Sequence, residues 1–166
     1  MGHYPHSIFM LTLSLLLILA TNLSAQPAND DCIGAMTITE GITPFDNLTA
    51  TDSGIPTDAN LCQGSFLGTA TRDVWFSYTA PENGYIDVTT CPAGFDTDLV
   101  IYDGDCTNLE QLSCNGDACF GFASTISDQS VDPGVTYLIR VGGFNGATGS
   151  GNLEITLTPA NDPEDC

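Results

Sequence analysis

The segment Phe95–Cys119 constrains the fold of this chain more than any other, because it combines an apolar run, a tight acidic turn and three cysteines. Apolar residues occupy both alternating faces of the run at 99–102, which is typical of a strand that is covered on both sides. The turn Asp103-Gly104-Asp105 follows, and the chain returns through residues 109–114. The segment therefore predicts a β-hairpin.

Short alternating runs make up most of the remaining chain, and residues that favour turns separate them. No long stretch shows a helical period. This pattern predicts an all-β, antiparallel β-sandwich in jelly-roll or related Greek-key order. Further strands are expected at 35–39, at 74–79, around Ile86 and Val88, and at 122–127, 135–142 and 152–158.

Some local features are predicted in more detail. The runs at 74–79 and 86–88 are separated by a turn at 80–84 and are expected to pair as a second hairpin. Residues 45–60 are rich in Thr, Asp, Gly and Pro, and we expect a long loop there with a short strand near Leu48.

Three aromatic residues, Trp75, Phe76 and Tyr78, lie together on one predicted strand. Aromatic side chains supply much of the core of a β-sandwich, so we expect them to be buried. The alternative is an exposed aromatic platform that stacks on sugar rings.

The N-terminus is typical of an exported protein. The apolar run Ile8–Ala20 is too short to span a bilayer, and Leu23-Ser24-Ala25 resembles a cleavage site before Gln26. We interpret residues 1–25 as a signal peptide, with an uncleaved anchor as the alternative, and residues 26–158 as one domain. No second apolar segment follows, so we expect no membrane span after cleavage and a secreted or cell-surface location.

The charge of the chain excludes several classes of function. Its formal net charge is −19, and its bases are Arg72 and Arg140, with both histidines, His3 and His6, in the predicted signal peptide. A mature chain without His or Lys has no His-activated nucleophile, no His-ligated zinc and no Lys nucleophile. Nucleic acid and anionic lipid would be repelled, because both are bound through Lys and Arg. Cations are the expected partners.

The cysteines predict disulfides, because an exported chain rarely uses thiolates as metal ligands. Six cysteines lie within the predicted domain and allow fifteen pairings. Proximity in the sequence favours a bridge across the hairpin, Cys106 with Cys114. The other two pairs are then proposed as Cys32 with Cys62 and Cys91 with Cys119.

The C-terminal residues 159–166 resemble the start of the mature chain. Pro159-Ala160-Asn161-Asp162 repeats Pro27-Ala28-Asn29-Asp30, and Cys166 would correspond to Cys32. We interpret this segment as a linker or the start of a further repeat. Chance similarity of two polar linkers, or a bridge from Cys166 within this domain, are the alternatives.

Four polar side chains are candidate ligands for Ca²⁺. A hairpin at 95–119 would bring Asp96 and Asp98 to the same end as Asn115 and Asp117. Calcium prefers such oxygen donors. The alternative is that these residues only shape turns through hydrogen bonds to their own backbone.

An ordered set of segments resembles the pre-peptidase C-terminal (PPC) type of bacterial β-sandwich. The set covers nearly the whole mature chain and comprises NDDC at 29–32, DVWFSYTAP at 73–81, FDTDLVIYDG at 95–104, CNGDAC at 114–119 and GVTYLIRVGG at 134–143. The resemblance implies a non-catalytic module attached to exported peptidases, other hydrolases or adhesins. Relatives bind Ca²⁺ and sometimes collagen or polysaccharide.

The resemblance also bears on the calcium ligands. It places the family's strand-head aspartate at Asp96 and the acidic return loop at Asn115 and Asp117. This loop has Asn-Gly-Asp where relatives often have Asn-Asp-Asp, so one possible ligand is missing. The hairpin at 98–104 is also similar to that of CUB domains, which we keep as the alternative fold.

The sequence thus predicts a non-catalytic exported binding, adhesion or accessory module that Ca²⁺ stabilises. Its expected partners are an extracellular polymer, a matrix or surface protein, and further domains of a larger exported chain. A glycosidase-like hydrolase that uses two carboxylates is one alternative. A purely structural spacer repeat of an adhesin is the other.

Overall fold

The computed structural model of the protein describes residues 1–2, 25–64 and 68–160. The apolar run of the predicted signal peptide and nearly all of the predicted linker at 159–166 lie outside the described residues. Among the residues that are described, no helix is long and apolar enough to cross a membrane.

Strands are the main regular elements of the described chain, and three single-turn 3₁₀ helices lie in the loops between them. The 3₁₀ helices are η1 (Cys32–Gly34), η2 (Ala59–Leu61) and η3 (Phe144–Gly146). The strands are β1 (Met36–Ile38), β2 (Gly41–Asp46), β3 (Thr71–Thr79), β4 (Gly84–Thr89), β5 (Thr97–Asp105), β6 (Asn108–Asn115), β7 (Thr125–Val131), β8 (Thr136–Gly143) and β9 (Ser150–Pro159).

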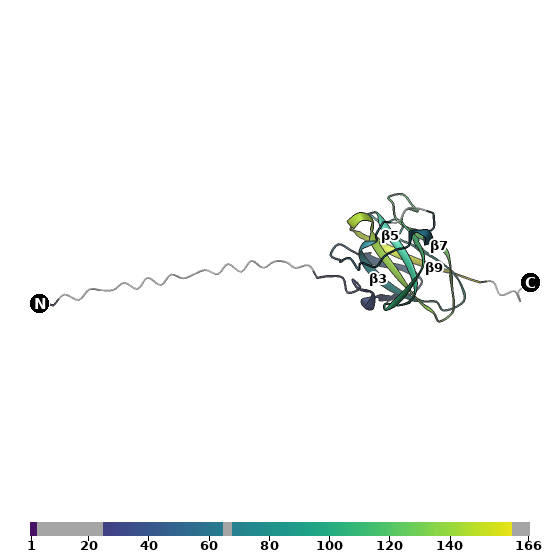
Figure 1. The fold of residues 1–166 in the computed structure, drawn as a ribbon, viewed down its shortest axis with the longest axis horizontal. Coiled ribbons are helices and arrows are strands. Elements are labelled where there is room, and N and C mark those ends of the chain that lie inside the picture. Colours follow the sequence, from purple (N-terminus) through teal and green to yellow (C-terminus); the bar gives the residue numbers. More distant parts are fainter. Residues whose placement is uncertain (3–24, 65–67, 161–166) are drawn as a thin grey trace, which may run out of the picture.

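The strands form two sheets that pack face to face (Figure 1). One sheet has the order β1-β3-β8-β5-β6 and the other the order β2-β9-β4-β7. Strands β1 and β3 are parallel, and the other neighbouring strands are antiparallel. The predicted all-β sandwich is therefore confirmed.

The main core lies between the two sheets and follows the two-residue period of the strands. On β4, Ile86 and Val88 are fully buried while Asp87 between them is exposed, as predicted. The four-stranded sheet therefore has one face against the core and one face toward solvent.

The five-stranded sheet is covered on both faces. A second apolar cluster on its outer face contains Trp75, Val100 and Tyr102, and parts of the N-terminal segment and of the loop after β2 pack against it. All of residues 99–102 are buried, which confirms the prediction for this run. Phe76 and Tyr78 belong to the core between the sheets, so all three predicted core aromatics are buried.

One of the two predicted hairpins is wrong. Strands β5 and β6 pair as predicted, with Leu99 opposite Asn115. Strands β3 and β4 do not pair, because β3 belongs to the five-stranded sheet and β4 to the four-stranded one. The turn at 80–83 leads from one sheet to the other, so that both strands bury their apolar residues in the same core from opposite sides.

Two predicted strands also differ from the structure. The strand expected at 122–127 begins at Thr125, because Phe122 has a left-handed backbone with φ 64° and belongs to the preceding turn. Leu48 lies in a turn, where its N–H donates to Asp46 Oδ1 at 2.8 Å. The start of the loop expected at 45–60 belongs to β2.

The disulfides match the prediction at one of three pairs. Cys91–Cys119 is formed as predicted, but the other bridges are Cys32–Cys106 and Cys62–Cys114. Cys106 lies at the hairpin turn, whereas Cys114 is opposite Val100, six residues along β6 from Asn108 at the turn end of that strand. Six residues of strand span about 20 Å, far beyond the reach of a disulfide. Each cysteine is instead paired with one in the loops that cover the outer face.

Candidate functional site

The four predicted calcium ligands lie around the end of the β5–β6 hairpin that is remote from its turn. We call Asp96, Asp98, Asn115 and Asp117 the acidic strand end. Asp96 precedes β5, Asp98 is the second residue of β5, and Asn115 is the last residue of β6. Asp117 follows in the next loop and is exposed.

Asp98 is the buried carboxylate of this group. Its Oδ1 accepts the N–H of Gly68 at 3.1 Å, and its Oδ2 accepts the N–H of Ala70 at 2.9 Å. Burial raises the pKa of Asp98, while the two backbone N–H groups oppose that shift and the charge of Asp117 adds to it. The ionised side chain is thus held mainly by backbone amides.

Asp96 and Asp117 add like charges to the same region. Partial burial raises the pKa of Asp96, and the charges of Asp117 and Asp98 raise it further. The three carboxylates are therefore close enough to repel one another. Among the described residues, however, no three Asp, Glu, His or Cys side chains are grouped to hold a metal ion. Backbone carbonyls or water would have to complete a Ca²⁺ site here.

Asn115 connects three segments of the chain. Its Nδ2 donates to the carbonyl of Gln63 at 2.7 Å, and its Oδ1 accepts the N–H of Thr125 at 3.0 Å. These bonds attach the loop before β3 and the start of β7 to the end of β6. The side chain therefore fixes the base of the loop that contains Asp117.

A buried cation lies on the outer face of the same sheet. The Arg140 side chain is only 1% exposed, and its Nε donates to Asp73 Oδ2 at 2.9 Å. The guanidinium nitrogens donate to the carbonyls of Ile55 and Ala70 at 2.9 and 2.8 Å, with a longer bond to Tyr102 Oη. One guanidinium thus ties β8 to the loops at 52–57 and 68–71.

Neighbouring groups complete this buried pair. Trp75 Nε1 donates to the same Asp73 oxygen at 2.9 Å, and the Ser53 N–H donates to the other at 2.9 Å. The guanidinium lies 5.7 Å from the Trp75 ring centroid, which is within cation–π range. Sequence reasoning missed the pair, although a lone Arg inside the apolar run Tyr137–Val141 was a usable signal.

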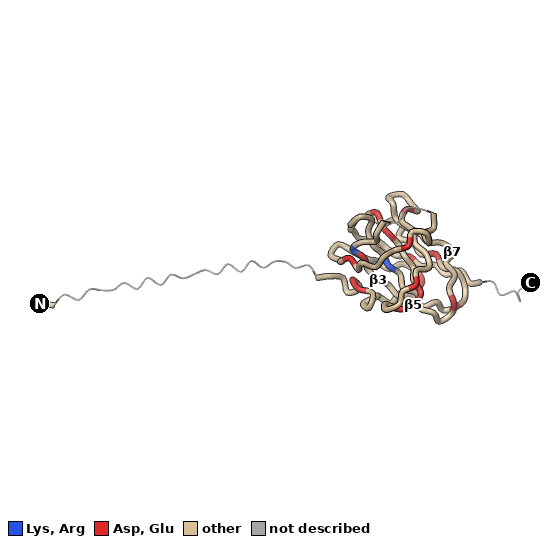
Figure 2. The backbone as a smooth tube through the Cα atoms, in the orientation of Figure 1, with Lys and Arg blue, Asp and Glu red and all other residues tan. Residues whose placement is uncertain are grey.

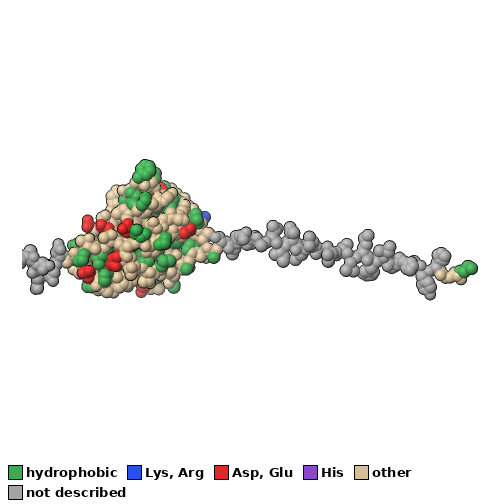
Figure 3. Space-filling view, turned by 180° about the vertical axis from the view of Figure 1, so that it is seen from behind, with side chains coloured by type: hydrophobic (Ala, Val, Ile, Leu, Met, Phe, Trp, Pro, Cys, Tyr) green, Lys and Arg blue, Asp and Glu red, His purple; other side chains and the backbone are tan. Residues whose placement is uncertain are grey.

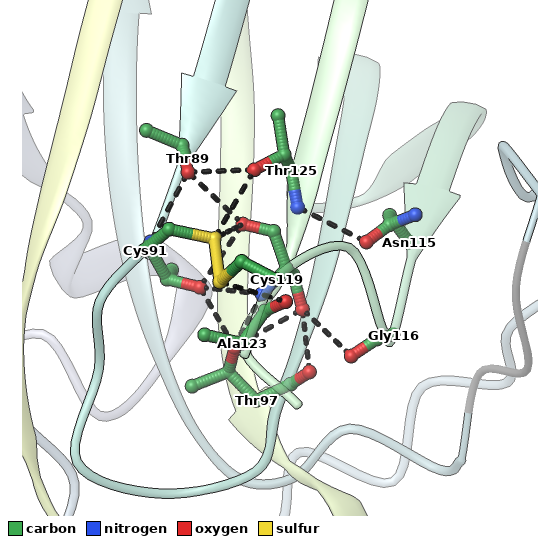
Figure 4. Close-up of a disulfide and its surroundings, with 10 residues drawn as sticks. Thr89, Cys91, Thr97, Asn115, Gly116, Cys119, Ala123 and Thr125 are labelled. Carbon is green, nitrogen blue, oxygen red and sulfur yellow. Dashed lines mark hydrogen bonds between the residues drawn. A yellow bond between two sulfur atoms is a disulfide. The ribbon is translucent and has the colours of Figure 1, made fainter. Parts of the chain in front are cut away.

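A cluster of hydroxyl groups surrounds the Cys91–Cys119 disulfide (Figure 4). Buried Thr90, Thr97 and Ser124 form a hydrogen-bonded group, with Thr90 Oγ1 and Thr97 Oγ1 separated by 2.7 Å. The N–H of Ser124 donates to both threonine hydroxyls. This network fixes the loop between β6 and β7 to the end of β4 and the start of β5, and it was not predicted from the sequence.

Three cavities of the described chain are lined by carboxylates. One of about 530 Å³ is lined by Asp30 and Asp31 near η1, and Asp30 there accepts two hydrogen bonds from Thr51. A second, of about 300 Å³, is lined by Asp52 and by Arg140, and a third, of about 310 Å³, is lined by Asp46. The carboxylates with raised pKa values, Asp96 and Asp98, line none of these three cavities.

Acidic residues are spread over many loops of the domain, whereas Lys and Arg are found at few positions (Figure 2). Arg72 is exposed and Arg140 is buried, so the surface of the described chain is almost entirely acidic or neutral. Such a surface disfavours polyanionic ligands.

Comparisons with known proteins identify a family for this chain. A family described as Galactose binding domain-like, and associated with T9SS, matches residues 28–155. The chain is also similar to the solved pre-peptidase C-terminal domain of collagenase from Bacillus anthracis. The two are 14% identical with a TM-score of 0.45, over 74% of this chain and 94% of that one. No curated protein matches. The chain belongs to this galactose-binding-domain-like family, and the PPC-like β-sandwich predicted from the sequence is consistent with it.

Proposed function

We propose that this chain, which belongs to the T9SS-associated family of galactose-binding-domain-like modules, is an exported accessory module that binds Ca²⁺ at its acidic strand end. The family supports a non-catalytic module and export as part of a larger protein. Its task, in this proposal, is to attach that protein to an extracellular polymer, a matrix protein or a surface protein.

The observation that carries the calcium proposal is the mutual repulsion of three carboxylates. Asp98 is buried and Asp96 is partly buried, and each has its pKa raised by burial and by the charge of Asp117. A hard divalent cation would remove this cost by neutralising the group. Each carboxylate oxygen of Asp98 accepts a backbone N–H, and a carboxylate oxygen can accept more than one hydrogen bond.

The fit to Ca²⁺ is one of chemistry. Asp96 and Asp117 would supply the charged oxygens, with Asp98 behind them, and backbone carbonyls or water would complete the shell. Asn115 would act mainly by positioning, because its amide oxygen already accepts the Thr125 N–H. Bound Ca²⁺ would supply charge neutralisation and would order the loops at this end of the sandwich.

No specific observation favours the hydrolase alternative. A two-carboxylate hydrolase needs an acid of raised pKa in a cavity together with a second carboxylate. Asp96 and Asp98 have raised pKa values but do not line the carboxylate-containing cavities.

Thermal unfolding tests the calcium proposal. Stripping the protein with EDTA should lower its melting temperature, and adding Ca²⁺ at a hundredfold excess over its dissociation constant should restore about 2.7 kcal/mol. For a domain of this size that corresponds to roughly 5–10 °C. Asp96→Asn and Asp117→Asn should each weaken the response.

The matched control is Glu110→Gln, which removes one exposed carboxylate near the turn end of the same hairpin. This variant should respond to Ca²⁺ like the original protein. An unchanged melting temperature after EDTA and Ca²⁺, or an equal loss of response in Glu110→Gln, would contradict calcium binding at the acidic strand end.

A further inference from the structure

Two phenylalanines stand out among the exposed residues of the loop between β6 and β7. Phe120 is 102% exposed and Phe122 is 62% exposed, although aromatic side chains of this size are normally buried in a soluble domain. We call residues 119–123 the aromatic tip. On the face of the domain that Figure 3 shows, hydrophobic side chains are interspersed with acidic and other residues.

The aromatic tip is held in place by several independent bonds. Ala118 and Cys119 donate their N–H groups to the carbonyl of Ala123 at 2.9 and 3.2 Å, and the N–H of Phe122 donates to Cys119 at 3.1 Å. The carbonyl of Phe122 accepts the N–H of Thr97 at 3.2 Å. The Cys91–Cys119 disulfide anchors the first residue of the tip, and Figure 4 shows this bridge close to Ala123, the last residue of the tip.

The backbone of the tip has an unfavourable conformation. Gly121 and Phe122 have positive φ angles of 90° and 64°, and a left-handed backbone is uncommon for an aromatic residue. Such conformations persist only where the surroundings enforce them, and they cluster at functional sites. Here the disulfide and the hydrogen bonds enforce a turn that leaves both rings in solvent.

A rigid pair of exposed rings has the properties of an interaction hot spot. Aromatic residues dominate the energetics of many protein interfaces, and a preorganised loop loses little entropy on binding. Phenylalanine has no polar tip with which to bond sugar hydroxyls, unlike tyrosine or tryptophan. The rings therefore suit an apolar protein pocket better than a glycan.

The charges around the tip indicate which kind of protein partner would be complementary to it. Asp117 lies three residues before Phe120, and Asp96 precedes Thr97, which is bonded to Phe122. The chain has a net charge of −19 and no lysine, so a second copy of itself or an anionic membrane would be repelled. A complementary partner has a basic border.

We infer that the aromatic tip is a docking site for a protein partner that presents an apolar pocket bordered by Lys or Arg. Phe120 and Phe122 insert into the pocket, and Asp96 and Asp117 pair with its basic border. The docking uses the negative charges of Asp96 and Asp117, which Ca²⁺ bound at the acidic strand end would neutralise. It is therefore tested in EDTA, where both carboxylates keep their charge.

The probe is an amphipathic synthetic peptide of Leu and Lys, labelled for fluorescence anisotropy. Two peptides of the same length serve as controls, one of Leu and Glu and one of Ser and Lys. The Leu-Lys peptide should bind, and the other two should bind at least tenfold more weakly. Phe120→Ser with Phe122→Ser should weaken binding of the Leu-Lys peptide roughly ten- to a hundredfold.

Ile42→Ser is the matched protein control, because Ile42 is 65% exposed and lies on β2, at the opposite edge of the sheet from β7. It should leave peptide affinity unchanged. All variants should keep the melting temperature of the original protein, since the changed side chains are exposed.

Three outcomes would overturn the inference. One is equal affinity of the Leu-Lys peptide for the original protein and the double Phe variant. Another is no binding of that peptide at all. The third concerns zwitterionic phosphatidylcholine vesicles and neutral oligosaccharides. If the protein binds either of them through the two phenylalanines but does not bind the peptide through them, the tip is assigned to a membrane or a glycan.

Discussion

Two buried carboxylates in this domain, Asp73 and Asp98, are stabilised in different ways. Both side chains have no exposed surface. Asp73 contacts the guanidinium of Arg140 at 2.9 Å and also accepts bonds from Trp75 and Ser53. Asp98 accepts two backbone N–H groups and has like charges for neighbours.

The difference separates a structural pair from a candidate binding site. Asp73 has its counter-ion inside the fold, so its charge is neutralised whatever the solution contains. Among the described residues, Asp98 has no ion-pair contact of its own, and two backbone N–H groups, with a smaller contribution from the charge of Arg140, oppose the rise in its pKa that burial and the charge of Asp117 cause. Only the second region gains from a cation supplied by the solution. This contrast is the physical basis of the calcium proposal.

Arg140→Met should have the largest effect on stability. It leaves Asp73 buried without its cation and leaves the carbonyls of Ile55 and Ala70 without donors. Loss of one member of a buried pair costs about 3–5 kcal/mol. Urea unfolding at pH 7 measures the loss. Adding Asp73→Asn should recover part of the lost stability. A loss below about 1 kcal/mol for Arg140→Met would mean that the Arg140–Asp73 pair does not stabilise the fold.

Asp98→Asn should have a smaller effect. Asparagine has one acceptor oxygen, so one of the N–H groups of Gly68 and Ala70 loses its partner at a cost of about 1–3 kcal/mol. Removal of a buried charge of raised pKa offsets part of this cost. Urea unfolding in EDTA should therefore show a net loss of about 1–2 kcal/mol. A loss as large as that of Arg140→Met would abolish the contrast between the two regions.

The pH dependence should be the smallest effect and should have a definite sign. Because the folded-state pKa values of Asp96 and Asp98 are raised, folding binds protons at these residues. Their contribution to stability is fully present below the ordinary pKa of 3.8 and is lost as the pH rises through the higher folded values. In EDTA, acidification from pH 7 toward pH 4 should therefore raise the urea midpoint.

Asp96→Asn should reduce this rise, and Glu110→Gln is again the control. The measurements stay above pH 3.8 because of Asp105, whose pKa is lowered by hydrogen bonds from Thr107. Its contribution to the stability of the folded protein is lost as the pH falls below that value. A urea midpoint that falls steadily from pH 7 to pH 4 in EDTA would contradict the proposed cost of burying the charges of Asp96 and Asp98 close to one another.

The strand pattern was predictable where residues followed a two-residue period. The hairpin of β5 and β6 and the burial of residues 99–102 followed from local alternation and one turn. Alternation could not show that β3 and β4 belong to different sheets. It shows which residues face the core but not which sheet a strand joins. Turn residues such as those at 80–83 are equally compatible with a hairpin within one sheet and with a connection from one sheet to the other.

The sites were predictable only in part. The sequence indicated the acidic strand end, because its carboxylates follow from one hairpin. It did not indicate the Arg140–Asp73 pair, whose members are 67 residues apart, or the hydroxyl cluster of Thr90, Thr97 and Ser124. Such contacts depend on how the loops cover the sheet. Phe122 and Ala123, the last two residues of the aromatic tip, were assigned to a strand because the left-handed backbone of Phe122 has no local signature.

The sequence alone determined the class of the domain: short alternating strands, an acidic surface without lysine, and cysteines that form disulfides. These properties depend on local period and composition, which a chain carries before it folds. The tertiary structure decided the strand order, the partners of Cys32, Cys62, Cys106 and Cys114, and the different surroundings of Asp73 and Asp98. These depend on distances between segments that are remote in the sequence, and such distances exist only once the two sheets have packed.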